Sequence, residues 1–209
     1  MLTKRLIVFC QFILTGFYFL NAQPIPMEVV LGNKYTWYQY SASKKLSESK
    51  FGVFGTGSLI APYKENKKEE LMNQFYLTYE LLKGIKASVG SFYSTQPGFR
   101  PSVNIQFFKA VKNLTVLAVP RIDICKNPSY DLMFLLEYKP KIAGQLPLYS
   151  KFQSMFNFSG DKHNRSYQYL RLGINLKHLQ TGIAINFDAY GPAITYRRNY
   201  GLFIRKDFR

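Results

Sequence analysis

The stretch from Ser166 to Ala189 constrains the fold more than any other part of the chain, because it alternates apolar and polar residues in two successive runs. The first run places four apolar residues on one face: Leu170, Leu172, Ile174 and Leu176. The second run does the same with Ile183, Ile185, Phe187 and Ala189. A period of two is typical of β-strands with one apolar face. The opposite faces carry polar residues such as Arg171 and Asp188, which suits a sheet with lipid or a core on one side and water on the other.

The same design continues along the chain from Gln23, so we expect one all-β domain. Short alternating runs are separated by polar connections, and their number predicts about twelve strands. The count falls to ten if the first run, 25–31, is not a strand, because Pro24 and Pro26 disturb it. Pro120 lies inside another run and requires a bulge or a position where the ladder needs no donor.

The predicted connections alternate between longer and shorter ones when they are counted back from the C-terminus. The longer ones are 190–198, 159–165, 125–129, 94–101 and 62–73, and the shorter ones are 177–180, 139–144, 109–113 and 83–84. Outer-membrane barrels have short periplasmic turns and longer external loops. We therefore expect an antiparallel up-and-down transmembrane β-barrel with both termini on the periplasmic side.

The start of the chain has the layout of a secretory signal peptide. Lys4 and Arg5 precede an apolar run over 6–20, and Asn21-Ala22-Gln23 offers a cleavage site after Ala22. We expect residues 1–22 to be removed and 23–209 to form the barrel domain. One cysteine, Cys125, follows the predicted cleavage site, so an intrachain disulfide does not shape the fold.

Alternation alone does not separate a membrane barrel from a soluble, lipocalin-like periplasmic barrel, since both have one apolar face. The aromatic residues near strand ends favour the membrane barrel, because such rings form belts at the lipid headgroups. We assign to these belts Tyr35, Trp37, Tyr93, Tyr130, Tyr138 and Tyr200. The less apolar faces carry charges of both signs that would pair in a narrow lumen: Glu80, Asp123, Asp131, Glu137, Arg171, Asp188 and Arg205.

The last run resembles the C-terminal signal of outer-membrane proteins, an alternating strand with an aromatic residue at its end. Its shared face carries Tyr200, Leu202, Ile204 and Phe208. Lys206 interrupts that face and Arg209 follows the aromatic residue. With the whole chain after residue 22, this ending resembles the small outer-membrane barrels of Bacteroidota. The resemblance implies an outer-membrane location and contact with the barrel-insertion machinery, and it implies no activity.

Catalytic chemistry has few candidates. His163 lies beside Asn164 and Ser166 in a predicted external loop, and a Ser/His/Asn set resembles the catalytic residues of the outer-membrane phospholipase, which is also a barrel. A hydrolase needs the histidine within hydrogen-bond reach of the serine and a third group to orient it. His178 falls in a predicted periplasmic turn, where we expect it to be solvated. Asp161 and His163 are too few to predict a metal site, and we expect no cofactor.

The composition adds a strongly basic balance, with a formal net charge of +16 over the full chain. Nucleic acid is not an expected partner of an exported chain, whereas the phosphates of phospholipids and lipopolysaccharide are. The sequence therefore predicts a non-enzymatic outer-membrane barrel, acting as a narrow pore or as a subunit of a larger assembly with other outer-membrane proteins. A lipid hydrolase using His163 and Ser166, and a soluble binding barrel, remain the alternatives.

Overall fold

A computed structural model describes residues 25–64, 68–140, 147–176 and 178–208 of the chain. The predicted signal peptide, 1–22, lies outside the described residues. The structure contains twelve strands: β1 (Ile25–Gly32), β2 (Tyr35–Lys45), β3 (Phe51–Pro62), β4 (Glu70–Leu82), β5 (Ile85–Ser94), β6 (Gly98–Val111), β7 (Leu114–Asp123), β8 (Tyr130–Tyr138), β9 (Leu148–Ser159), β10 (Lys162–Leu176), β11 (Leu179–Tyr190) and β12 (Thr195–Phe208).

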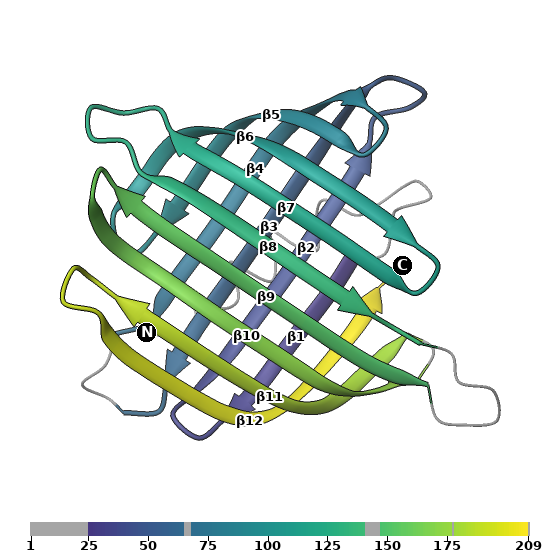
Figure 1. The fold of residues 1–209 in the computed structure, drawn as a ribbon, viewed down its shortest axis with the longest axis vertical. Coiled ribbons are helices and arrows are strands. Elements are labelled where there is room, and N and C mark those ends of the chain that lie inside the picture. Colours follow the sequence, from purple (N-terminus) through teal and green to yellow (C-terminus); the bar gives the residue numbers. More distant parts are fainter. Residues whose placement is uncertain (1–24, 65–67, 141–146, 177, 209) are drawn as a thin grey trace, which may run out of the picture.

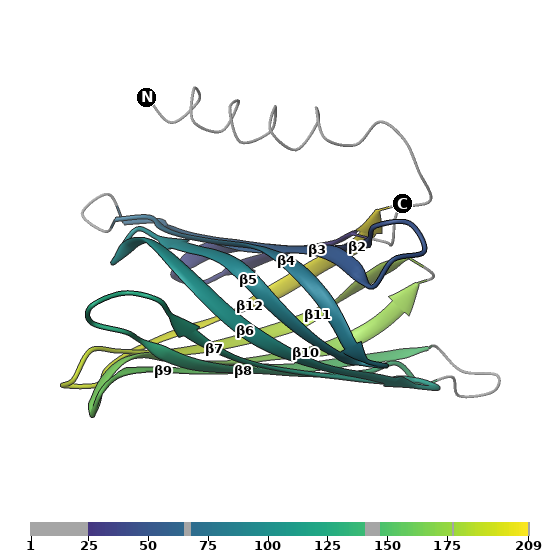
Figure 2. The same ribbon diagram turned by 90° about the horizontal axis from the view of Figure 1, so that it is seen from above.

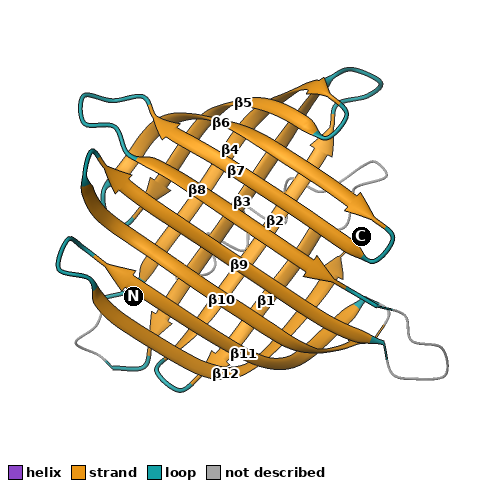
Figure 3. Ribbon diagram, in the orientation of Figure 1, coloured by secondary structure: helices purple, strands orange, loops and turns teal. Residues whose placement is uncertain are grey.

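Each strand pairs antiparallel with its neighbours in the sequence, and β1 closes the barrel by pairing with β12 (Figure 1). This confirms the prediction of a twelve-stranded up-and-down barrel. Among the described residues the elements are strands joined by turns and loops (Figure 3). Within that part of the chain there is no helix with the length and apolar character needed to cross a membrane.

The two predicted difficulties with proline are resolved locally. Strand β1 forms, and its pairing with β2 begins at Met27, after Pro26. In the ladder between β6 and β7 the register holds on both sides of Pro120, but the pairs that would join Ile105 to Pro120 and Gln106 to Val119 are missing. Because proline has no N–H to donate, a gap in the ladder is the expected solution.

The barrel has two ends, which we name by the connections they carry. The terminal rim contains the first residue of β1, the last residue of β12, and the connections 46–50, 83–84, 112–113, 139–147 and 177–178. The distal rim contains the connections 33–34, 63–69, 95–97, 124–129, 160–161 and 191–194.

The predicted alternation of long and short connections is wrong in its lengths. A short connection was expected at 139–144, but the interval between the ends of β8 and β9 at the terminal rim, 139–147, is the longest interval between strands. The connection expected at 159–165 shrinks to residues 160–161, because β9 and β10 continue into a tight turn with Gly160 at a φ of 59°. Polar residues such as Lys162 and Asn164 are therefore strand residues, which a pattern based on polarity assigns to a loop.

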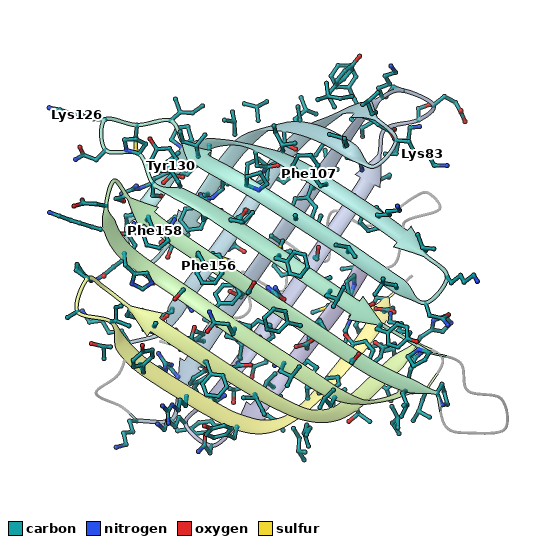
Figure 4. The ribbon with its side chains drawn as sticks, viewed as in Figure 1. Lys83, Phe107, Lys126, Tyr130, Phe156 and Phe158 are labelled. Atoms are coloured by element: carbon teal, nitrogen blue, oxygen red, sulfur yellow. The ribbon has the colours of Figure 1, made fainter. Side chains whose placement is uncertain are left out.

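The outward face of the barrel is apolar, and it includes four of the six residues predicted for aromatic belts. Tyr93, Tyr130, Tyr138 and Tyr200 are between 41% and 48% exposed. Figure 4 labels further aromatic side chains on the outside of β6 and β9, namely Phe107, Phe156 and Phe158. This is the reverse of a soluble β-barrel, whose apolar residues point inward.

Tyr35 and Trp37 are corrections to the belt prediction, because both point into the barrel. Trp37 pairs with Val30, and Tyr35 follows the same side of β2. The two aromatic side chains are 0% and 1% exposed. Strand β2 carries aromatic residues on both faces, Trp37 on one and Tyr38 on the other, so its pattern did not identify the lipid side.

Candidate functional site in the barrel interior

The seven charged residues predicted for the lumen all lie on the inward face of their strands. The register places them in line with inward residues of neighbouring strands, for example Arg171 opposite Lys151 and Ala184. Six of them make ion pairs or hydrogen bonds in four clusters, described below. Glu80 stands opposite Lys86 on β5, and no ion pair joins it to another described residue.

The first cluster is centred on Glu28, a residue that the sequence reasoning missed. Arg171 Nε donates to Glu28 Oε1 at 2.7 Å, and Lys151 Nζ donates to the other carboxylate oxygen. Arg171 Nη1 also donates to Asn186 Oδ1 at 2.7 Å. On β9 the alternation that puts Gln153 inward also puts Lys151 inward, two residues earlier, so the sequence pattern could have identified Lys151 as a lumen residue. For Glu28 the only signal in the sequence was the alternation of the run 25–31, which prolines disturb.

The second cluster lies near the terminal rim around Glu137. Lys139 Nζ is 2.7 Å from the Glu137 carboxylate, and Tyr149 Oη donates to Glu137 Oε2 at 3.0 Å. Arg205 Nη1 donates to the same carboxylate oxygen and lies 2.5 Å from Tyr149 Oη. Strands β8, β9 and β12 are thus joined through one carboxylate.

The third cluster surrounds Asp188 on the distal side. Its carboxylate accepts hydrogen bonds from Tyr35 Oη at 3.0 Å, Tyr169 Oη at 2.8 Å and Arg165 Nη2 at 2.8 Å. Arg165 also lies 3.4 Å from a carboxylate oxygen of Glu70, which links this cluster to β4 across the interior.

The fourth cluster joins β6, β7 and β8 near the distal rim. Arg121 donates to Asp123 Oδ1 at 2.8 Å and, through Nε, to Asp131 Oδ2 at 2.7 Å. Ser129 Oγ donates to Asp123 Oδ2 at 2.6 Å, and Arg100 lies 3.1 Å from that oxygen. Buried charges of this kind are tolerated because they are paired, and the loss of one partner costs about 3–5 kcal/mol.

Large side chains fill the interior along β1, β2 and β9–β12, which we call the packed side. Their buried cluster is Val30, Tyr35, Trp37, Ile60, Tyr149, Tyr167, Tyr169, Ala184 and Phe203. Tyr149 pairs across the strands with Gly173, and Phe203 pairs with Gly182. Gly173 and Gly182 face each other, so the two rings, 5.6 Å apart between centroids, have room over small residues. Alternation of large and small inward residues is how narrow barrels are filled.

Beside this cluster the interior is hollow, and we call the interior along β3–β8 the open side. A cavity of about 1490 Å³ is lined by residues from both rims. At the terminal rim these include Pro26, Phe108 and Thr115, and at the distal rim they include Lys34 and Pro192. The interior therefore combines a packed cluster and buried ion pairs with a chamber, which residues of the packed side such as Glu28, Gln153 and Arg205 also line.

Cations outnumber anions among the described residues that line this chamber. The nine cations are Lys34, Lys64, Lys68, Arg100, Arg121, Lys151, Arg165, Arg197 and Arg205. The five anions are Glu28, Glu69, Glu70, Asp131 and Glu137. The lining thus has an excess of positive charge, which raises the local concentration of anions.

The candidate pair His163 and Ser166 is not in a loop, as predicted, but in β10. The ladder with β9 shifts between His163 and Arg165, so Asn164 is the extra residue of a bulge. His163 pairs with Phe158 and Ser166 with Phe156, which puts both candidates on the outward side of the ladder, and His163 also lines the distal end of the chamber. A bulge changes the parity of a strand, and the sequence pattern carried no sign of it.

The bulge brings the two candidate side chains into contact. His163 Nε2 is 3.1 Å from Ser166 Oγ, and His163 Nδ1 is 2.9 Å from the carbonyl oxygen of Gly191. A proton on Nδ1 would therefore leave Nε2 free to accept from the serine. Asn164 does not complete the set, because its side chain donates to Asn157 and Ser159.

The remaining residues singled out in the sequence lie on the outward face of β12 or in the turn before β11. Tyr200, Leu202, Ile204 and Phe208 are all exposed on the outward face of β12. His178 is exposed in the turn before β11. In the described part of the chain no group of three or more His, Cys, Asp or Glu residues has a geometry suited to a metal ion.

Comparison with known proteins identifies the fold and leaves the family open. No protein-family model matches the sequence, and no curated protein matches it. Among solved structures, the barrel is similar to the KdgM porin, with a TM-score of 0.50 and 10% identity over 89% of this chain and 99% of that one. It is similar to the NanC porin with a TM-score of 0.50 and 9% identity over 90% of this chain and 100% of that one.

A lower similarity links the barrel to LpxR from Salmonella typhimurium, with a TM-score of 0.43 and 8% identity over 88% of this chain and 100% of that one. That similarity is too low to support an argument about chemistry. The comparisons, together with the closed sheet and its apolar outer face, establish a twelve-stranded barrel with the fold of small outer-membrane porins.

Proposed function

We propose that the protein is an integral outer-membrane barrel that forms a narrow pore with a preference for small anions. The observation that carries this proposal is the chamber on the open side, whose lining reaches from the terminal rim to the distal rim. A barrel with a purely structural role would be expected to fill its interior on all sides, as the packed side is filled. The porin fold and the excess of lining cations support the same function.

The orientation and the partners follow from this proposal. With the terminal rim in the periplasm, as in outer-membrane barrels generally, the distal rim faces the outside and its cations meet the phosphates of lipopolysaccharide. The alternating face of β12, which ends at Phe208, would be read by the barrel-insertion machinery, and a signal peptide over 1–22 would direct export. The sequence resemblance of the C-terminal run suggests a protein of the Bacteroidota type.

Single-channel recording in planar bilayers tests the pore directly. We expect discrete conductance steps and, in a salt gradient, a reversal potential of the sign that anion selectivity gives. Protein that is heat-modifiable on electrophoresis, and therefore folded, but gives no conductance would rule out the pore and leave a structural role in a larger assembly.

A second candidate function is supported by the contact between His163 and Ser166. The histidine is oriented by the Gly191 carbonyl and can accept the serine proton, which is the first requirement for a serine nucleophile. Because both residues face outward, the substrate class would be the esters of the surrounding lipids. The test is lipid turnover in reconstituted membranes. An equal rate for the wild type and Ser166→Ala would reject this assignment.

A further inference from the structure

The hollow side of the interior has an apolar wall that a simple aqueous pore does not need. We propose that the chamber binds amphipathic anions, with the apolar body of the ligand against this wall and its acidic head at the distal mouth. The inference rests on the proposed pore for access to the chamber, and it names the class of molecule that the pore takes.

The wall is continuous across β7, β8 and β9. Leu117 pairs with Leu135, Val119 pairs with Met133, and Met133 pairs with Met155. Cross-strand partners lie on the same face of a sheet, and all five residues line the chamber. An unbroken apolar strip therefore runs along one side of the cavity at mid-height.

A second apolar surface lies across the chamber. Phe54 on β3, Met72 on β4 and Phe92 on β5 also line it. The barrel is flattened, with β2–β5 lying across from β7–β10 (Figure 2). A ligand between these strands would contact apolar side chains on two sides, as in most small-molecule sites.

Packing buries some of these inward apolar residues, such as Val119 at 5% and Phe54 at 8% exposed, and leaves the others partly open. On the packed side Trp37 and Phe203 are 1% and 0% exposed, because other side chains cover them. Leu117, Met133 and Leu135 stay only partly buried, Met155 is partly buried against the packed cluster, and Phe108, at the terminal end of the wall, is 49% exposed although it points inward. Apolar surface left open to water is unfavourable by roughly 25 cal/mol per Å², so a molecule that covers it gains that free energy.

The lysines at the distal mouth of the chamber indicate that the ligand is an anion. Lys34, Lys64 and Lys68 line the chamber there and are exposed, and within the described residues none of the three is in an ion pair. Arg121, which is deeper, is occupied by Asp123 and Asp131. A carboxylate, sulfonate or phosphate at the mouth would therefore meet available lysines, and three methionines along the walls would adapt to bodies of different shape.

The chain contains its own reporter for this test. Trp37 is the one tryptophan in the sequence and it points into the barrel. Lys151, which lines the chamber, has its Nζ 5.9 Å from the centroid of the Trp37 ring. Bromine quenches tryptophan fluorescence at short range. The full chain in phosphatidylcholine nanodiscs is titrated with 6-bromohexanoate, 8-bromooctanoate and 11-bromoundecanoate, and with gluconate as an anion without an apolar body.

We expect saturable quenching whose midpoint falls roughly two- to fourfold for each added methylene, and no competition by gluconate. Leu117→Asn combined with Met133→Gln should remove the dependence on chain length. Ser41→Asn, a polar change in the same chamber away from the wall, should leave it intact. If the double variant does not give heat-modifiable barrels, Met133→Gln alone replaces it. Equal midpoints for the three chain lengths, or equal behaviour of the wall variant and wild type, would overturn the inference.

Conductance recorded on the same preparations separates this inference from the proposed pore. Conductance without chain-length dependence would overturn the ligand class and leave the pore standing. Chain-length-dependent binding without conductance would overturn the pore and support a binding barrel for the same class of ligand.

Discussion

Trp37 on the packed side and Phe108 on the open side both point into the barrel, yet they are 1% and 49% exposed. On the packed side, large rings lie over small residues such as Gly173 and Gly182, and buried ion pairs join strands across the interior. On the open side, medium-sized residues such as Met133 and Leu135 lie side by side on one face of β8 and line a chamber that they do not fill. Both sides have the same alternation of inward and outward residues. Whether the interior is filled therefore depends on the sizes of the side chains that meet there.

The largest expected effect comes from breaking the first charge cluster of the packed side. Glu28→Ala leaves Lys151 and Arg171 buried without their carboxylate, so we expect a loss of about 3–5 kcal/mol in the free energy of unfolding. Urea unfolding of the protein in lipid measures this loss in the free energy of unfolding. The matched change on the open side, Glu80→Gln, removes a charge that has no ion pair among the described residues and should cost at most about 1 kcal/mol. Equal losses in the two variants would contradict the division of the interior.

Overpacking the glycine pair should have the next largest effect. In Gly173→Ala the new Cβ would lie 2.0 Å from the backbone oxygen of Thr181, so the strands must shift, at a cost of about 1–3 kcal/mol. The control is Gly55→Ala in β3, where the nearest atom is the Gln74 oxygen at 3.6 Å and the expected change is within about 0.5 kcal/mol. The midpoint of the heat-dependent mobility shift ranks the two variants.

Narrowing the open side should change conductance more than stability. Met133→Trp adds volume inside a chamber with free space, so we expect the single-channel conductance to fall by at least about half while the free energy of unfolding changes by about 1 kcal/mol or less. Phe156→Trp places the same side chain on the lipid face and should leave conductance unchanged. An unaltered conductance in Met133→Trp would mean that ions do not pass along the open side.

The smallest effect on stability is expected at the distal mouth. Lys64→Glu with Lys68→Glu replaces two exposed lining cations, so the reversal potential in a salt gradient should move toward cation selectivity. The free energy of unfolding should change by about 0.5 kcal/mol or less, since both residues are at the surface. Lys126→Glu, an exposed change at the same rim that is not in the chamber lining, should leave the reversal potential in place.

Much of the fold could be predicted because the alternation is local and repeats along the chain. The faces of β4, β5, β8, β11 and the part of β10 from Ser166 onward were predicted from the alternation, and the strand number followed from such runs. The errors fall where two signals conflict or where a bulge changes the alternation without a sign in the sequence. Trp37 and Tyr38 are neighbours on opposite faces, and the bulge at Asn164 moves His163 to the side of Ser166.

The candidate site was predicted in part. The inward parity of Asp131, Glu137 and Arg171 was visible in their runs, because parity needs only two or three neighbours. Their partners were not visible. Arg171 binds Glu28, which is 143 positions away, and Arg205 binds Glu137, which is 68 positions away. Side chains at such separations meet only after the barrel has closed.

The sequence by itself determined which residues face outward and inward along most strands, and hence that twelve strands alternate between lipid and lumen. Only the tertiary structure decided that one side of the lumen is packed and the other is hollow. The physical reason is that alternation depends on the backbone geometry of a single strand, whereas filling depends on the volumes and charges that closure brings together. The tertiary structure therefore sets Tyr149 and Phe203 against glycines, brings Trp37 beside Tyr169, and leaves the wall of Leu117 and Met133 open.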